Sequence, residues 1–421
     1  MYVWIFQTGE PLHIDKDGLR PMRAMCLANK LIKDGHKVLI ISSDFYHQKK
    51  IKRTSRFANF QINKNLRIDL IPSIGYKKNI GFLRIVDHII LGINLKQYLS
   101  KKDIELPDVV FIGYPPIETS FFLISWLKKN KIKCILDVKD DWPQTFITPF
   151  SEIFRPIIKV FLLPYIYMAK SCMQRADAIT SISLPLLRWV QIFSDRKEKN
   201  YNAFQNDFVA PLVREPIKII KNNEKKDLKK IFNFKKDNYL IFVGSITSSF
   251  DFPLIYEAAK IIYKKDQNLK ILIAGNGDKF NEIKILFKLS PNVILLNFVD
   301  KFTAANLIKE SIGTIAPYYK FTHYERSIPN KFIESIEYGK PIITTLSGEV
   351  GNIIKNYQLG FSNCNNANDF AYASLQLYFD KKLKNQYSIN CLKLFKKKYS
   401  YDIVFEKFIR SLNSLIKSKN F

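Results

Sequence analysis

A lysine and a glutamate, Lys331 and Glu334, lie three residues apart just after Pro329. Pro329 suits the first turn of a helix, and Gly339 followed by Pro341 predicts the end of that helix and the start of an apolar strand. Free N–H groups at a helix amino terminus, together with the charge of Lys331, could bind a phosphate, and Glu334 could accept two hydrogen bonds from a ribose diol. The pattern therefore predicts a nucleotide site. The alternative is an amphipathic surface helix with an ordinary Lys–Glu pair.

The segment also resembles a known family. Asn330, Lys331 and Glu334, followed by a Gly-Lys-Pro turn before an apolar run, are similar to the donor-binding segment of retaining glycosyltransferases of the GT-B fold. The likeness is greatest to the bacterial family 4 enzymes that assemble surface polysaccharides such as lipopolysaccharide or capsule, and it spans nearly the whole chain. It implies that Glu334 holds the ribose of a nucleotide sugar and that sugar transfer retains the anomeric configuration.

A second turn could hold the diphosphate of the same ligand. Gly244 and Ser245 follow an apolar run and precede a helical one, so backbone N–H and hydroxyl groups there could cradle phosphates. The alternative is a tight strand-to-helix turn with no ligand. Family members commonly carry Arg just after this glycine and Lys five residues later, where this chain has Ser245 and Phe250. Lys331 is therefore the expected phosphate cation.

Two further turns contain donor-site candidates. Gly275 and Gly277 end the next apolar run, where the resemblance implies contact with the nucleotide base, although a simple turn would also need such glycines. Glu349 could bring a carboxylate to the donor sugar. Members usually carry a further Glu eight residues before the ribose-binding one, but this chain has Arg326 there. Glu325 is one place off, so we do not transfer that role to it.

Polar residues in the first half also follow apolar runs. Gly9 and Glu10 end the first run and Arg20 precedes a helical segment, so these three could bind an acceptor or a phosphate; a solvated arginine is the alternative for Arg20. Asp140 lies in an acid-rich segment that ends in Trp142 and a proline, as in family relatives. We expect Asp140 to be catalytic, either by hydrogen-bonding the transferring sugar or by stabilising positive charge at the anomeric carbon, unless it caps the following turn.

The elements that would position these residues alternate between strand-like and helical patterns. Continuous apolar strands separated by helices predict parallel, doubly wound sheets. The pattern loosens from Tyr201 to Lys236, with a linker near Phe208 to Pro216, and then restarts. Strands are expected at 3–6, 37–43, 109–113, 133–138, 178–183, 239–244, 269–275, 293–296, 314–317 and 341–345, and helices at about 21–34, 118–130 and 253–264.

Two Rossmann-like domains follow, since 421 residues exceed what one core usually supports. The expected domains are an acceptor-binding one over 1–208 and a nucleotide-sugar-binding one over 217–400, with facing strand ends that enclose the active site. Apolar residues at helical spacing predict a helix over Tyr401 to Ser418, and the resemblance implies that the segment 401–421 packs back on the first domain. The predicted fold is α/β of the GT-B type.

The net charge of +28 predicts an anionic partner or surface. Lysines predominate and no zinc, RNP or homeodomain pattern occurs, so we expect no nucleic acid. An anionic bilayer attracts lysine clusters, although a genome rich in A and T would give the same lysine excess. The five cysteines are scattered and no histidines stand four residues apart, so we expect a reduced cytoplasmic setting, no cofactor and no metal.

Three first-domain segments mix cations with apolar residues: His47 to Arg56, Tyr76 to Arg84, and Phe150 to Lys170. Such a composition fits an interfacial surface on anionic lipid, and a buried helix with snorkelling ends is the alternative for the third segment. No run reaches the ~20 apolar residues of a membrane span. The expected protein is a peripheral enzyme on the inner face of the cytoplasmic membrane.

The predicted activity is transfer of a sugar to a polyprenyl-diphosphate-linked or other glycan acceptor, and we expect the donor to be a UDP-linked hexose. In the retaining chemistry that the resemblance implies, the leaving diphosphate takes the acceptor proton, so no strong general base is needed. Two other functions remain open: a sugar-nucleotide epimerase or hydrolase of the same fold, and a non-enzymatic basic protein that binds membranes.

Overall fold

The chain forms two compact units in the computed structural model, which describes residues 1–15, 20–77, 82–101, 104–148, 150–217, 232 and 234–417. Unit 1 comprises Met1–Arg214 and Val404–Phe421, and unit 2 comprises Glu215–Ile403. The stretch from Tyr201 was expected to be irregular, but it begins with helix α9 and strand β10. Residues 218–231 and 233 of that stretch lie outside the described residues.

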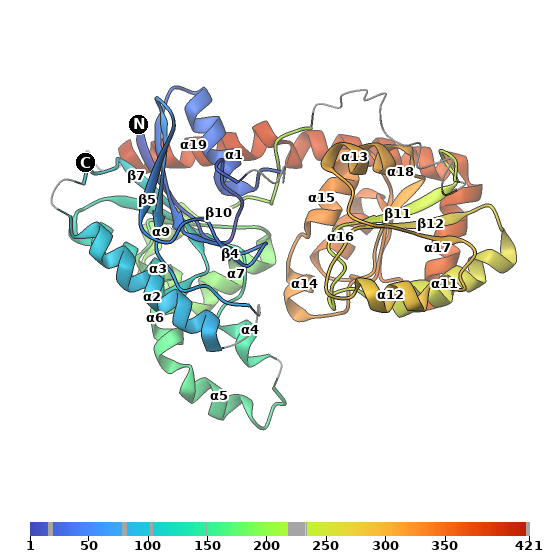
Figure 1. The fold of residues 1–421 in the computed structure, drawn as a ribbon, viewed down its shortest axis with the longest axis horizontal. Coiled ribbons are helices and arrows are strands. Elements are labelled where there is room, and N and C mark those ends of the chain that lie inside the picture. Colours follow the sequence, from blue (N-terminus) through green and yellow to red (C-terminus); the bar gives the residue numbers. More distant parts are fainter. Residues whose placement is uncertain are drawn as a thin grey trace. The chain divides into compact units, whose positions relative to one another are not determined.

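Unit 1 is built on an eight-stranded sheet in the order β10-β9-β8-β7-β1-β2-β6-β5 (Figure 1). All neighbouring strands are parallel except the antiparallel pair β5 and β6. The strands are β1 (Tyr2–Phe6), β2 (Lys37–Ser43), β5 (Ala58–Asn63), β6 (Leu66–Ile71), β7 (Val109–Tyr114), β8 (Lys133–Val138), β9 (Ala178–Ser181) and β10 (Phe208–Val209). The predicted basic loop at His47 to Arg56 contains one side of a small hairpin, β3 (Phe45–Tyr46) with β4 (Ile51–Lys52).

Helices cover both faces of this sheet, as the run of fully buried strands requires. On one face, α2, α3, α6 and α7 bury a core centred on Trp4, Phe6 and Leu136. The helices of the unit, apart from its last one, are α1 (Arg23–Lys33), α2 (Phe82–Leu99), α3 (Ile117–Lys129), α4 (Gln144–Ile147), α5 (Arg155–Phe161), α6 (Leu163–Arg175), α7 (Leu184–Phe193), α8 (Arg196–Lys199) and α9 (Tyr201–Gln205).

The last helix, α19 (Tyr401–Lys417), packs on unit 1. Phe408 is fully buried, with its ring centroid 5.6 Å from that of Phe111 in β7 and 5.4 Å from that of Phe208 in β10. The Arg23 guanidinium lies 5.2 Å from the centre of the Phe408 ring. Apolar positions at helical spacing thus become the buried face of α19, and they close unit 1 with a segment from the far end of the sequence.

Unit 2 has a fully parallel six-stranded sheet in the order β13-β12-β11-β14-β15-β16. Its strands are β11 (Tyr239–Val243), β12 (Lys270–Ala274), β13 (Val293–Leu296), β14 (Gly313–Ala316), β15 (Ile342–Thr344) and β16 (Gly360–Phe361). Its helices are α11 (Phe252–Lys265), α12 (Phe280–Leu286), α13 (Lys301–Glu310), α14 (Thr322–Arg326), α15 (Asn330–Glu337), α16 (Glu349–Tyr357), α17 (Ala367–Phe379) and α18 (Lys381–Leu394), followed by a π-helical turn, Phe395–Tyr399. Two doubly wound α/β units confirm the predicted fold class.

Helix α5 carries no buried side chain, and Figure 1 shows it at an end of unit 1 beyond the helices that cover the sheet. The apolar side chains exposed on and beside it are Phe150, Ile153, Phe154, Ile157, Val160, Phe161, Leu163 and Tyr167. In the part of the chain that the structure describes, no single helix has the length and apolar character to cross a membrane; α5 and α6 together would, but they are bent by 71° where they meet.

Candidate functional site

Lys331 points from α15 to the end of β11 in unit 2. Pro329 precedes the first residue of α15, and Gly339, with a φ of +64°, follows its last turn, as the sequence predicts. The Lys331 ammonium donates a hydrogen bond to the Val243 carbonyl and lies 3.7 Å from the centre of the Phe242 ring. Lys331 thus brings a cation to the carboxyl end of β11, and strand ends of this kind carry ligands in parallel α/β sheets.

Three predicted glycines lie beside this lysine. A Cβ on Gly244 would stand 2.5 Å from Lys331 Nζ, and one on Gly275 would overlap the Gly244 carbonyl oxygen. A Cβ on Gly277 would overlap the backbone of Ile246. Gly244 and Gly275 also have φ values of +143° and +153°, which L side chains rarely adopt. The structure thus brings Gly244, Gly275 and Gly277 together with Lys331 at the carboxyl ends of β11 and β12.

Glu334 lies one turn along α15 from Lys331, and both side chains border a small cavity of about 10 Å³ with Val243 and Thr314. Asn330 and Glu334 are half-buried, whereas Ser245 is exposed. Glu349 is the first residue of α16. Burial, followed by the charge of the nearby Glu349, raises the pKa of Tyr399 in the π-helical turn.

Glu325 holds a position that the motif comparison does not predict. Its carboxylate accepts hydrogen bonds from the backbone N–H of Ser347, at 3.1 Å, and from that of Gly348, directly before α16. A Cβ on Gly348 would overlap Glu325, so a glycine is required there. The neighbouring Tyr324 hydroxyl bonds Ser249 Oγ at 2.7 Å. Helix α14 therefore ties the 244–250 turn to the loop that precedes Glu349 and α16.

A second site is a pocket of about 200 Å³ in unit 1, where β1, β2, β7 and β8 end. Gly9, Glu10 and Asp140 line it, as the sequence predicts for strand-end loops, whereas Arg20 is not among its lining residues. Asp140 is exposed. The pocket is also lined by His47, Tyr76 and Arg84, which belong to two segments that we expected to face lipid. The lining side chains that the sequence analysis does not mention include Gln7, Thr8, Ser43, Asp87, His88, Tyr114 and Lys139.

Glu10 is bound within the protein at the base of this pocket. One carboxylate oxygen accepts the Ala24 N–H at 2.9 Å, at the start of α1, and the other pairs with the Lys139 ammonium. Beside them, Arg23 pairs at 2.5 Å with buried Asp137, whose pKa is raised by burial and lowered in part by Arg23. This ion network fixes the loop after β8 that carries Asp140.

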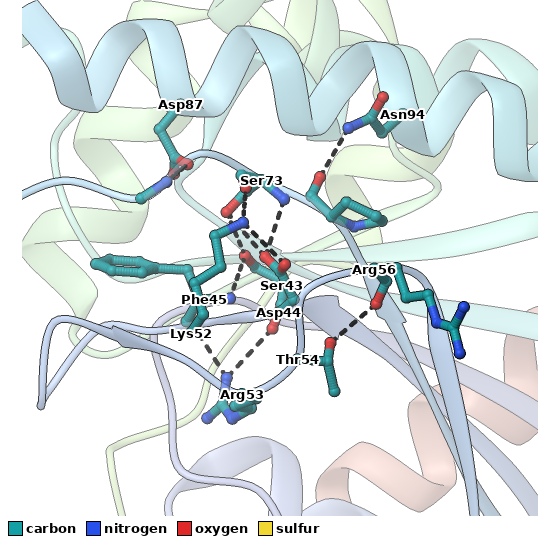
Figure 2. Close-up of polar contacts among 12 residues, drawn as sticks. Ser43, Asp44, Phe45, Lys52, Arg53, Thr54, Arg56, Ser73, Asp87 and Asn94 are labelled. Carbon is teal, nitrogen blue, oxygen red and sulfur yellow. Dashed lines mark hydrogen bonds and ion pairs between the residues drawn. The ribbon is translucent and has the colours of Figure 1, made fainter.

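A polar network also fixes the opposite wall (Figure 2). Buried Asp44 accepts the Ser73 N–H at 2.9 Å and pairs with Lys52 at 2.9 Å. Asp87 accepts the Gly75 N–H at 2.6 Å. Arg53 also pairs at 2.7 Å with Asp15, which Figure 2 does not draw. Lys52 and Arg53, which we expected to belong to a lipid-facing basic loop, are thus engaged in ion pairs within unit 1.

Two histidines line the pocket in surroundings that disfavour their charged form. Burial, with Lys50 and Arg84 nearby, lowers the pKa of His47 to about 4, and burial lowers that of His88 to about 3. His88 Nδ1 lies 3.8 Å from buried Glu118, which accepts a hydrogen bond from the Tyr165 hydroxyl. Burial raises the pKa of Glu118 to about 7. No spacing or motif signalled these residues, because they come from separate elements.

Among the described residues, no group of three or more His, Cys, Asp and Glu side chains gathers as a metal site would require. The sequence-based expectation of a metal-independent protein stays a prediction.

Comparisons with known proteins agree on the class of this chain. Residues 223–393 match the family model described as glycosyl transferases group 1. No curated protein sequence matches the chain. Among solved structures, HepE of Anabaena, determined in complexes with UDP and with UDP-glucose, is similar with a TM-score of 0.64 and 10% identity over 98–99% of this chain and 100% of HepE.

Two further structures have the same fold. WaaG, a glycosyltransferase involved in lipopolysaccharide biosynthesis, has a TM-score of 0.61 and 10% identity over 99% of both chains. TarM has a TM-score of 0.59 and 14% identity over 97% of this chain and 98% of its own. Unit 2 therefore carries a glycosyl transferases group 1 domain, and the chain is a glycosyltransferase with the GT-B fold.

Proposed function

We propose that the protein transfers a hexose from a UDP-linked donor held by unit 2 to a polyprenyl-diphosphate-linked glycan held by unit 1, with retention, in bacterial surface polysaccharide biosynthesis. The observation that carries the proposal is the Lys331 ammonium at the Val243 carbonyl, beside Gly244 and one turn from Glu334. The UDP and UDP-glucose complexes of HepE support a uridine donor.

In this proposal, catalysis rests on the leaving diphosphate. Lys331 and the N–H groups of the Gly244 turn stabilise the negative charge that grows on it, and Glu334 fixes the ribose. Asp140 and Glu349 stabilise positive charge at the anomeric carbon. The diphosphate accepts the proton of the attacking hydroxyl. These residues need no cofactor or metal for their roles.

We propose that the acceptor reaches unit 1 from a membrane. The apolar side chains on and beside α5 are exposed, and Arg155, Lys159 and Lys170 lie among them. Burying such side chains contributes about 1.5 kcal/mol or more each, and a cation near an anionic surface about 1 kcal/mol. We infer that α5 lies on the inner leaflet of the cytoplasmic membrane, which would bring a lipid-linked acceptor to unit 1. This inference and the net charge of +28 support a peripheral location.

Thermal melting with a panel of nucleotides and nucleotide sugars tests the proposal. UDP and a UDP-sugar should raise the melting temperature, and ADP should not. A protein that only binds membranes would show no shift with any nucleotide. An epimerase or hydrolase would shift with the same ligands but would convert the UDP-sugar without an acceptor. Transfer that requires a lipid-linked acceptor, followed by product mass, separates these cases.

A further inference from the structure

The unit 1 pocket has a basic end built around Tyr76. The Tyr76 hydroxyl bonds His47 Nδ1 at 2.7 Å, and Lys50 Nζ lies 3.1 Å from the same nitrogen. Lys50 Nζ and Arg84 Cζ stand 4.7 and 5.5 Å from the centre of the Tyr76 ring. The Arg84 guanidinium also lies 4.7 Å from the Trp142 ring centre. Side chains from the β3–β4 hairpin, the loop after β6 and α2 thus converge on one point.

This end of the pocket brings basic groups together in partly buried surroundings. Burial and then Arg84 lower the pKa of Lys50 to about 8, and burial, Lys50 and Arg84 lower that of His47 to about 4. Basic groups here share poorly solvated space and disfavour one another's charge. Asp87 also lines the pocket, with its carboxylate bound to the Gly75 N–H, and Asp140 lies at the end of β8.

We propose that Arg84, Lys50 and His47 bind the phosphate group of the lipid-linked acceptor. Arginine can meet two phosphate oxygens at once, lysine supplies a point charge, and a neutral imidazole can donate one hydrogen bond. The pocket volume of about 200 Å³ is enough for a phosphate and part of a sugar. The inference rests on the proposed transfer to a lipid-linked glycan and assigns the acceptor phosphate to unit 1.

Calorimetry on the full chain saturated with UDP tests the assignment, because UDP keeps the probe out of the donor site. The probes are geranyl diphosphate below its micelle concentration and inorganic pyrophosphate. Geranyl diphosphate should bind, and Arg84→Gln and Lys50→Gln should each weaken it 10-fold or more. Lys49→Gln, an exposed neighbour in the same turn, should bind like the wild type. UDP affinity and the melting temperature of each variant show that it is folded.

The number of protons taken up on binding is a second measurement, and a variant that is merely misfolded would not change it in the same way. A bound anion should raise the pKa of Lys50, so binding at pH 8 should take up protons in the wild type and fewer in Lys50→Gln. Intrinsic fluorescence should also change on binding, and Trp142→Phe should reduce the change.

The outcomes distinguish the proposed phosphate site in unit 1 from the proposed donor site in unit 2. Unchanged geranyl diphosphate binding in Arg84→Gln and Lys50→Gln, or no binding by the wild type, would overturn the phosphate site while leaving UDP binding intact. Pyrophosphate binding without geranyl diphosphate binding would also overturn it, since the pocket would then serve a free anion. Loss of UDP binding alone would instead defeat the proposed donor chemistry.

Discussion

At the scale of single residues, the buried pair formed by Glu118 and Tyr165 should make the folding stability of unit 1 depend on pH. The Glu118 side chain is 2% exposed and accepts the Tyr165 hydroxyl, and burial raises its pKa to about 7. An acid whose folded-state pKa is raised favours folding in its protonated form, so its contribution is complete below the unfolded pKa near 4.5 and is lost as pH rises through about 7.

Glu118→Gln should therefore flatten the pH dependence of stability. Because one pKa unit is worth about 1.4 kcal/mol, the wild type should lose on the order of 3 kcal/mol relative to the variant between pH 4.5 and 8. Urea unfolding of unit 1 at several pH values measures this difference. Glu152→Gln, at an exposed carboxylate of the same unit, is the control and should keep the wild-type profile. Parallel profiles for Glu118→Gln and the wild type would refute the argument.

Residue types alone identified only part of the sites. Lys331, Glu334 and Gly244 were predictable because helix and turn signals surround them within short segments. The polar wall of the unit 1 pocket was not, because His47, Arg84 and His88 meet only through tertiary packing. The roles of all these residues stay predictions until ligands are tested.

At the scale of elements, the sequence of α19 predicts that it is a helix but does not predict which sheet it packs on. The spacing of its apolar residues predicts an amphipathic helix, and the structure shows which sheet it covers. Strands β5 and β6 and helix α2 were not predicted. β5 is largely exposed and lacks a continuous apolar run, and its pairing with β6 is long-range information. Most of the parallel, buried strands were predictable because both of their faces are covered and their sequences are continuously apolar. Strand β6 is also parallel and buried, but the polar Arg67 and Asp69 interrupt its apolar run.

Phe408→Ala should destabilise unit 1 by about 3 to 5 kcal/mol, the usual cost of removing a buried phenylalanine. The side chain is fully buried against Phe111 and Phe208, so its loss leaves a cavity. Phe379→Ala in α17 is the matched control, since Phe379 is 62% exposed and should change stability by less than about 0.5 kcal/mol. Chemical denaturation followed by circular dichroism compares them. Similar midpoints for both variants would mean that α19 does not stabilise unit 1.

Helix α5 should bind lipid through its apolar residues. Replacing Ile157, Val160 and Phe161 by serine should reduce sedimentation with phosphatidylglycerol vesicles by 10-fold or more, because each side chain loses about 1.5 kcal/mol or more of burial. A matched double variant, Ile285→Ser with Leu289→Ser, removes side chains that are 76% and 86% exposed in unit 2 and should bind as the wild type does. Equal vesicle binding by all three proteins would show that α5 does not contact lipid.

At the scale of the whole molecule, the sequence predicts two parallel α/β domains well, since each strand–helix repeat carries a local signal. The net charge of +28 is an attribute of the entire chain, and no single loop accounts for it. Vesicle binding that weakens with added salt would link this charge to a membrane surface.

Calorimetric titration of UDP into the wild type, Lys331→Ala and Lys265→Ala tests the central claim most directly. Lys265 is an exposed lysine at the carboxyl end of α11, away from the strand ends that hold the glycines, so its variant should match the wild type. Lys331→Ala should bind UDP at least 10-fold more weakly, a loss of about 1.5 to 3 kcal/mol for a charged hydrogen bond. Equal UDP affinity in a folded Lys331→Ala protein would contradict the account.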